Sequence, residues 1–351
     1  CENGMAGPYP CDNVDLLGSV PLPMLGGATG SDNWGWTDPQ TGREYAIVGR
    51  TDGTSFVDVT DPQHPRYLGD LPKTAGSPPA AWRDMKVYKD HVFIVADNSA
   101  AHGVQVFDLT RLRNVRTPQT FTMDAHYTNL GSAHNIVMNE ETGFAYAVGA
   151  SSGGEGCGGG LHMIDVRDPK HPTFAGCFSD PSTGRAGTGY SHDAQCVVYR
   201  GPDQWYVGRE MCFGYNVTAI SVADVTDKAH PKAISTASYP NVGYAHQGWL
   251  SDDHRYYFLD DELDEQSGLG EAAKGTRTLV WDLADLDDPV LLTQHVGVTK
   301  AIDHNLYVKG NRMYQANYES GLRILDISDP INPREVGYLD TYPKGDTPQF
   351  N

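Results

Sequence analysis

Four histidines occupy matching places in a chain that repeats itself. His134, His192, His246 and His304 each open a strand-like segment, and each is followed by Asn, Asp or Gln. A neutral imidazole nitrogen suits Zn, Cu, Fe or Ni, so four imidazoles on one face could bind a transition metal. The same rings could instead donate hydrogen bonds to neighbouring units and tie them together. Acid–base catalysis is a third use that these residue types permit.

Charged residues at the ends of related segments extend this candidate site. Arg83 stands near the start of another unit, and we expect Arg83, Glu210 and the four histidines to bind a ligand. An acidic run begins with Asp260, Asp261 and Glu262. Carboxylate oxygens are preferred ligands of Ca²⁺ and Mg²⁺, although this run lacks the alternating spacing of an EF-hand loop. We therefore expect a divalent metal, either Ca²⁺ or a His-bound transition metal, with the four histidines, Asp260, Asp261 and Glu262 as its ligands.

A repeated phrase predicts the elements that position these residues. Six stretches alternate apolar and other residues and close on an aspartate, and most continue into a polar turn with a second Asp. The closing aspartates are 44 to 59 residues apart: Asp58, Asp108, Asp165, Asp224, Asp282 and Asp326. A period of about 40–60 residues with four strands per unit is typical of a β-propeller, whose first strands line the central channel. Asp and Pro are turn formers, so we expect a structural role for these aspartates.

Six complete repeats account for all of the predicted strands except one. Residues 13–23 resemble the second half of the repeated phrase but have no first half before them. The sequence therefore predicts an all-β propeller with six complete four-stranded blades, plus an N-terminal strand that belongs to a closing or seventh blade. We expect a Cys-bracketed lead-in over residues 1–13, a single propeller domain over 14–342 and a C-terminal tail over 343–351.

Six cysteines fall into three pairs that are local in the sequence. We expect the bridges Cys1–Cys11, Cys157–Cys177 and Cys196–Cys212, and therefore export to an oxidising compartment. A lipid-modified Cys1 is the alternative, and it would leave Cys11 without a partner. No CxxC motif supports a zinc ribbon.

Composition excludes several functional classes. The net charge is −19 and no basic stripe is present, which argues against a nucleic-acid partner. No apolar run approaches the roughly 18 residues of a transmembrane helix. The chain contains no Gly-x-Ser-x-Gly or HExxH motif. The adjacent residues Ser191, His192 and Asp193 cannot form a triad on a strand, because consecutive side chains point to opposite faces.

Several motifs resemble a known family. The phrase Leu-x-Ile-x-Asp-x-x-Asp-Pro is similar to the LVIVD repeat, and it is clearest over Leu322–Pro330. Asn33-Trp-Gly-Trp, Tyr190-Ser-His-Asp-Ala-Gln-Cys and Asp303-His-Asn-Leu-Tyr resemble the bacterial choice-of-anchor B proteins. The resemblance implies an exported or surface-held propeller and carries no agreed activity. That family usually continues with a further β segment, which adds to the question of how the last blade closes.

These observations favour a secreted or cell-surface binding or assembly module with a ligand or metal site at the channel face. The expected partner is extracellular or on the cell surface, and self-assembly is one form of it. One alternative is a metal-dependent hydrolase or lyase that uses the His ring. The other is a structural subunit of an extracellular assembly, completed by a strand from a neighbour.

Overall fold

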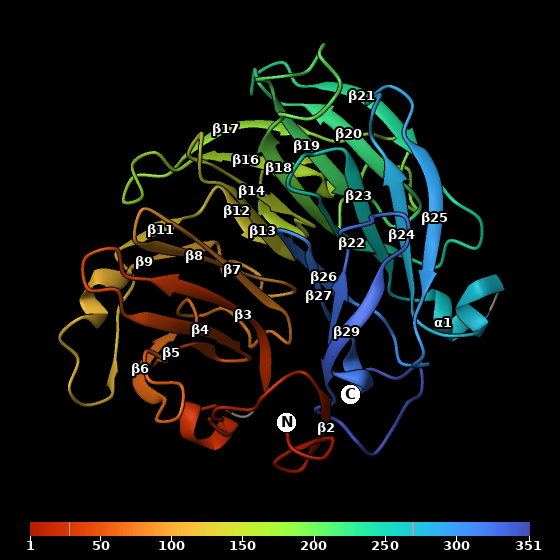
Figure 1. Cartoon of the computed structure of the whole chain (residues 1–351). Coiled ribbons are helices and arrows are strands. Elements are labelled where there is room, and N and C mark those ends of the chain that lie inside the picture. The colour runs from red at the N-terminus through yellow and green to blue at the C-terminus, as the bar shows by residue number, and fades with distance from the viewer. Residues whose placement is uncertain (28, 269) are drawn as a thin grey trace. The chain divides into compact units, whose positions relative to one another are not determined.

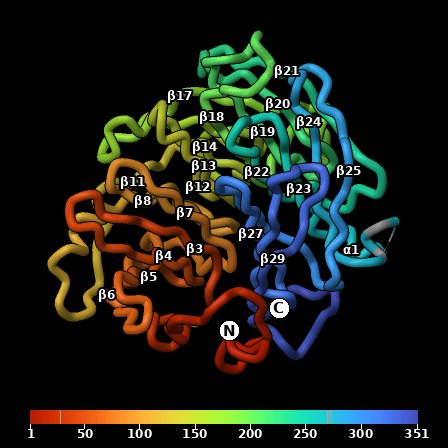
Figure 2. The backbone as a smooth tube through the Cα atoms, in the orientation of Figure 1, coloured from red at the N-terminus to blue at the C-terminus, as the bar shows by residue number. Residues whose placement is uncertain are grey.

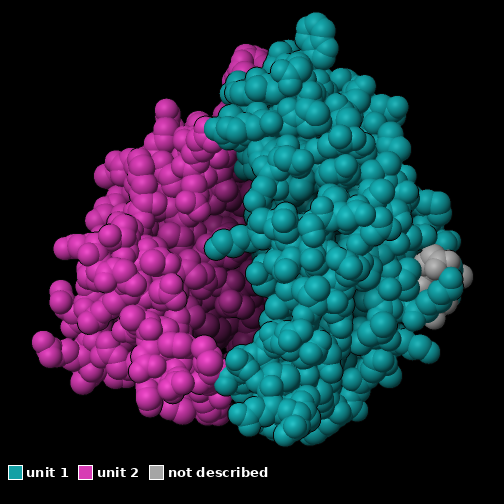
Figure 3. Space-filling model, viewed as in Figure 1, with its two compact units in different colours: residues 1–16, 180–226, 231–351 teal, residues 17–179, 227–230 magenta. Residues whose placement is uncertain are grey.

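The computed structural model describes residues 1–27, 29–268 and 270–351. Its regular structure is almost entirely β-strand, and six sheets, one for each sequence repeat, are built on four antiparallel strands (Figure 1). These sheets are the blades of a six-bladed β-propeller, so the predicted fold class is confirmed. The chain comprises two compact units with three blades each, which are coloured separately in Figure 3.

One unit comprises residues 17–179 and 227–230 and contains the first three blades. Their strands are, in chain order, β3 (Gly30–Thr37), β4 (Glu44–Arg50), β5 (Gly53–Asp58) and β6 (Arg66–Pro72); β7 (Arg83–Tyr88), β8 (His91–Ala96), β9 (Val104–Asp108) and β11 (Ala125–Tyr127); and β13 (Asn135–Asn139), β14 (Phe144–Val148), β16 (Leu161–Asp165) and β17 (Thr173–Phe178). Two additions are β10 (Gln119–Thr120), which pairs in parallel with β6, and the pair of β12 (Leu130–Ser132) and β15 (Ser152–Gly154).

The other unit comprises residues 1–16, 180–226 and 231–351 and contains the last three blades. Their strands are β18 (Asp193–Val198), β19 (Glu210–Tyr215), β20 (Ile220–Asp224) and β21 (Lys232–Ala237); β22 (Ala245–Leu250), β23 (Tyr256–Asp261), β24 (Arg277–Asp282) and β25 (Val290–Val296); and β26 (Asn305–Lys309), β27 (Arg312–Ala316), β28 (Leu322–Asp326) and β29 (Arg334–Leu339). The short helix α1 (Asp264–Ser267) follows β23, and a 3₁₀ turn (Tyr318–Ser320) follows β27.

The two-residue period of the strands builds the core on both faces of a blade. In β23, Tyr257 and Leu259 pack into one buried cluster, whereas Phe258 between them packs into another with Leu306 and Met313 of the next blade. Successive side chains of a strand point to opposite faces, so a nearly continuous apolar run fits a blade with neighbours on both sides. Each such side chain contributes roughly 1.5–3 kcal/mol when it is fully buried.

The repeated aspartates form turns, as their sequence context predicts. In all six blades the aspartate that closes the third strand accepts a hydrogen bond from the backbone N–H two residues later, at 2.9–3.1 Å. Asp58 and Asp326 are examples, with Thr60 and Ser328 as donors. These bonds fix the turn into the fourth strand, so the aspartates have the structural role that was expected of them.

The prediction of a strand over residues 13–23 is wrong. Residues 14–21 pair with no strand, and the chain then forms a 3₁₀ turn over Leu22–Leu25. Leu16 and Leu17 are exposed, so the apolar residues of this segment do not pack into a core. Prolines 21 and 23 also lack the backbone N–H that pairing in a sheet requires.

The strand that joins the last blade comes from the lead-in instead. β2 (Tyr9–Asp12), preceded by β1 (Met5–Ala6), pairs antiparallel with β29, and Cys11 lies opposite Leu339. In Figure 2 this red segment runs alongside the blue last blade. The structural-subunit alternative required an open blade edge that could pair with a strand from a neighbouring molecule. In the last blade, β2 of the same chain pairs with that edge.

All three predicted disulfides are present: Cys1–Cys11, Cys157–Cys177 and Cys196–Cys212. Cys196 and Cys212 lie directly opposite each other on β18 and β19. Three bridges indicate an oxidising environment. Among the described residues, no helix is long and apolar enough to cross a membrane.

Candidate functional site

Three of the four predicted histidines lie together in the unit that contains the last three blades. His192 immediately precedes β18, His246 lies in β22, and His304 immediately precedes β26. The ring centroids of His192 and His246 are 4.0 Å apart, and those of His246 and His304 are 4.5 Å apart. Equivalent residues of the last three repeats therefore lie side by side, whereas the prediction grouped all four histidines.

Backbone carbonyls fix the ring orientation of two of these histidines. Nδ1 of His192 is 3.1 Å from the carbonyl oxygen of His246, and Nδ1 of His246 is 3.0 Å from that of His304. A carbonyl oxygen only accepts, so Nδ1 carries the proton and donates it. In the neutral ring Nε2 then has the lone pair, which is the arrangement that metal-binding histidines use.

Glu262 meets two of the rings at Nε2. Its Oε2 lies 3.5 Å from Nε2 of His246, and its Oε1 lies 3.6 Å from Nε2 of His304. The side chains of His246, Glu262 and His304 are 3%, 15% and 29% exposed, so the group is shielded but reachable. One ligand atom from each lies within 4.8 Å of the other two. We call these three residues the His–Glu group.

Tyr318 completes the surroundings of the His–Glu group. Its hydroxyl donates to Oε1 of Glu262 at 3.0 Å, and its ring centroid lies 4.7 Å from that of His304. The residue has a backbone φ of 30°, a positive value that is uncommon for an aromatic residue and is often found at functional sites. Burial, with the Glu262 carboxylate beside it, raises the pKa of the Tyr318 hydroxyl, which therefore stays protonated as a donor.

His134 and Arg83 belong to the other unit, where each has its own partner. Nδ1 of His134 is 3.0 Å from Oδ2 of Asp97. Arg83 is buried, and its Nη1 is 2.9 Å from Nε2 of His102, a residue that the sequence did not single out. Burial, followed by the Arg83 charge, lowers the pKa of His102 to about 4, so this ring is neutral and accepts from the guanidinium.

Glu210 does not join the histidines. It opens β19 and lies opposite Val198, whereas Asp193, next to His192, lies opposite Tyr215 at the other end of the same strand pair. The prediction that Glu210 lies with the histidines at the ligand site is therefore wrong. It assumed that residues 209–210 end a second strand, but the strand starts there and runs on through Cys212.

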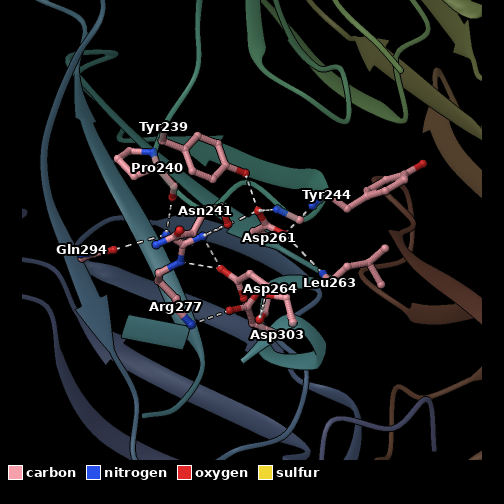
Figure 4. Close-up of polar contacts among 12 residues, drawn as sticks. Tyr239, Pro240, Asn241, Tyr244, Asp261, Leu263, Asp264, Arg277, Gln294 and Asp303 are labelled. Carbon is pink, nitrogen blue, oxygen red and sulfur yellow. Dashed lines mark hydrogen bonds and ion pairs between the residues drawn. The ribbon is translucent and has the colours of Figure 1, made fainter. Parts of the chain in front are cut away.

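Asp260 and Asp261 form hydrogen bonds with groups other than the three histidines. Asp260 is fully buried, accepts from Thr278 Oγ1 at 2.8 Å and from Gln315, and burial raises its pKa to about 8. Asp261 accepts from the Tyr239 hydroxyl at 2.9 Å and from the backbone N–H of residue 243 at 2.8 Å (Figure 4). Of the acidic residues predicted as metal ligands, only Glu262 reaches the histidines.

A second acidic group lies in the same unit: it combines the end of the predicted acidic run with Asp303, a combination that was not predicted. Asp264, Glu265 and Asp303 are buried, and one carboxylate oxygen from each lies within 4.8 Å of the others. Arg277 forms an ion pair with Asp264, and its backbone N–H donates to Asp303 at 2.6 Å (Figure 4). The only sequence signal for this group was the acidic run up to residue 265 and the aspartate before His304.

Comparison with known proteins supports the fold. Residues 303–341 match the model of the LVIVD repeat, which covers the last blade. No curated protein sequence matches the chain.

Solved structures resemble the chain at low sequence identity. A functionally unknown protein from Desulfotomaculum acetoxidans is 9% identical with a TM-score of 0.61, over 91% of this chain and 87% of that one. Hydrazine synthase from Kuenenia stuttgartiensis is 11% identical with a TM-score of 0.54, over 87% and 84%. A hypothetical selenium-binding protein from Sulfolobus tokodaii is 11% identical with a TM-score of 0.54, over 88% and 81%. At such identities the likeness shows the fold alone, so the chain is a β-propeller repeat protein.

Proposed function

We propose that this LVIVD-repeat β-propeller is an exported binding module whose ligand is a transition-metal ion held by the His–Glu group. Two imidazole nitrogens and one carboxylate form a mixed donor set that suits Zn²⁺, Fe²⁺ or Cu²⁺ better than Ca²⁺. The observation that carries the proposal is the convergence of both Nε2 atoms on Glu262, at 3.5 and 3.6 Å.

The surroundings of the group support this proposal. His246 donates its other ring N–H to a backbone carbonyl, and Glu262 accepts from Tyr318, so both side chains are oriented by a second layer of contacts. His192 packs on His246 and offers a further imidazole beside the group. A bound metal would polarise a ligand or substrate atom, while Glu262 and Tyr318 position it and control its protons.

The proposed cellular location rests on the disulfides and on the family resemblance. Three disulfides favour an oxidising, extracellular-type compartment. The resemblance to choice-of-anchor B proteins implies export or surface attachment, and the acidic net charge of −19 disfavours nucleic acid as the partner. We therefore propose an extracellular or cell-surface setting.

The test is Zn²⁺ binding by the purified full chain after chelator treatment, measured by calorimetry and by metal analysis of the dialysed protein. We expect one Zn²⁺ per chain. Glu262→Gln keeps the shape of the side chain and should weaken binding at least about tenfold, as should His304→Gln. His230→Ala is the matched control, because His230 is exposed and pairs only with Asp227 in a turn among the described residues.

Two results would overturn the proposal. The first is a wild-type protein that neither retains nor binds Zn²⁺, Fe²⁺ or Cu²⁺. The second is equal affinity in wild type, Glu262→Gln and His304→Gln. Circular dichroism of each variant shows that it is folded, so a loss of binding reports on the site itself.

A further inference from the structure

Three carboxylates from two separate segments meet inside the unit that contains the last three blades. Asp264 and Glu265 open helix α1, and Asp303 lies two residues before β26, next to His304. Asp264 and Asp303 are fully buried and Glu265 is 6% exposed. Burying one carboxylate is costly unless it is paired, and burying three in contact multiplies that cost.

The oxygens of these carboxylates divide into two sets. One oxygen of Asp264 pairs with the Arg277 guanidinium, and Oδ2 of Asp303 accepts the backbone N–H of Arg277. Oδ1 of Asp264, Oδ1 of Asp303 and both Oε atoms of Glu265 are buried, and none has a hydrogen-bond partner among residues 1–27, 29–268 and 270–351. Four acceptor oxygens from these three residues are therefore buried without a hydrogen bond, and one carboxylate oxygen of each residue lies within 4.8 Å of the others.

The charges within the group do not balance. Three carboxylates face one guanidinium, and Arg277 is further committed to the carbonyl oxygens of Pro240 and Asn241, at 3.1 Å each. The other side chains that act on Asp303 are all carboxylates: Glu265, Asp260 and Asp264. Three ionised carboxylates and one guanidinium leave the buried group with two uncompensated negative charges.

We propose that Asp264, Glu265 and Asp303 bind one hard divalent cation, Ca²⁺, through these four oxygens. The donor set contains oxygen only, and both Glu265 oxygens are available, which fits the bidentate carboxylate contact that Ca²⁺ accepts readily. Two positive charges also neutralise three carboxylates paired with one guanidinium. This site is separate from the His–Glu group in residues and in donor type, and it does not depend on the proposed function.

The bound ion would join the loop after β23 to the start of the last blade. Glu262, which precedes α1 by two residues, and His304, which follows Asp303, both belong to the His–Glu group. Calcium would therefore order the two segments that present these side chains. Its role in this arrangement is structural support for the neighbouring site.

The experiment titrates CaCl₂, and separately MgCl₂, into the full chain after EDTA treatment and dialysis, with calorimetry and thermal unfolding as readouts. We expect one Ca²⁺ per chain and a melting temperature that rises by several degrees at about 100-fold excess over Kd. Glu265→Gln should bind Ca²⁺ at least about tenfold more weakly and lose the melting shift. Asp303→Asn is the second variant, so a failure of one variant to fold leaves the test intact.

Two controls separate this site from other acidic groups. Asp287→Asn neutralises an exposed member of the acidic group Asp203, Asp285 and Asp287 and should leave Ca²⁺ binding unchanged. Glu262→Gln should keep Ca²⁺ binding while it weakens Zn²⁺ binding, so the two proposals can fail independently. The proposal is overturned if neither Ca²⁺ nor Mg²⁺ binds the wild type, or if Glu265→Gln and Asp303→Asn bind Ca²⁺ as tightly as the wild type.

Discussion

The contact between Arg83 and His102 predicts a specific loss of stability in mild acid. His102 is fully buried between the Arg83 guanidinium, which donates to Nε2, and the backbone carbonyl of Gly103, which accepts from Nδ1. Protonation would place a second positive charge against Arg83 in a buried position. The folded protein therefore binds this proton only near pH 4, whereas an unfolded histidine binds it near 6.5.

The sign and size of the effect follow from proton linkage. Between about pH 6.5 and 4 the unfolded state holds one more proton at His102 than the folded state, so stability falls as the pH is lowered through that window. A difference of about 2.5 pKa units at about 1.36 kcal/mol per unit amounts to roughly 3 kcal/mol, and the contribution is complete above pH 7.

The assay compares urea unfolding of wild type and His102→Gln at pH 7.5, 5.5 and 4.0. Glutamine does not titrate, so the stability of wild type relative to His102→Gln should fall by roughly 3 kcal/mol between pH 7.5 and pH 4.0. His64→Gln, in an exposed turn, should leave the pH dependence unchanged. A constant difference between wild type and His102→Gln at all three pH values would refute the reasoning.

Two further predictions concern packing and charge. Arg277→Met removes the guanidinium from Asp264 and should cost roughly 3–5 kcal/mol of unfolding free energy in urea. Adding Asp264→Asn should recover part of that loss, and simple additivity of the two changes would contradict the pairing. Gly69→Ala places a Cβ 1.9 Å from the carbonyl oxygen of Gln119 at a φ of +128°, so it should lower stability by roughly 1–3 kcal/mol or more. Gly42→Ala, at φ +67° with open space around it, is the control, and equal losses in the two variants would show that the β6–β10 contact is unimportant.

The blades could be predicted because their determinants are local in the sequence. An aspartate such as Asp326 bonds to an amide two residues away, and the alternation around Phe258 follows from strand geometry alone. The stacking of His192, His246 and His304 followed from the same periodicity, since equivalent positions of neighbouring repeats adopt equivalent places.

The sequence-based predictions were wrong where strands pair over a long sequence separation, and where a strand was expected to end at the wrong residue. Whether residues 9–12 or 13–23 join the last blade depends on the edge of β29, more than 300 positions away, and no local pattern encodes that choice. Glu210 was predicted at the end of a strand, but it is the first residue of β19, so it lies at the end of the blade away from His192. The meeting of Glu265 with Asp303 depends on how the loop after β23 folds back, and the acidic run alone gave no partner for it.

The pairing of β2 with β29 also constrains the order in which the protein can assemble. Residues 9–12 precede all six blades along the chain, yet their strand partner, β29, belongs to the sixth blade. The Cys1–Cys11 bridge lies within this segment, so oxidation can pre-form the small hairpin while its docking edge is still being synthesised. Delivery of a reduced chain would leave the last blade with an open edge for longer, and open edges are where chains associate wrongly. The Cys1–Cys11 bridge would thus protect the newly made protein from aggregation until the sixth blade has paired with β2.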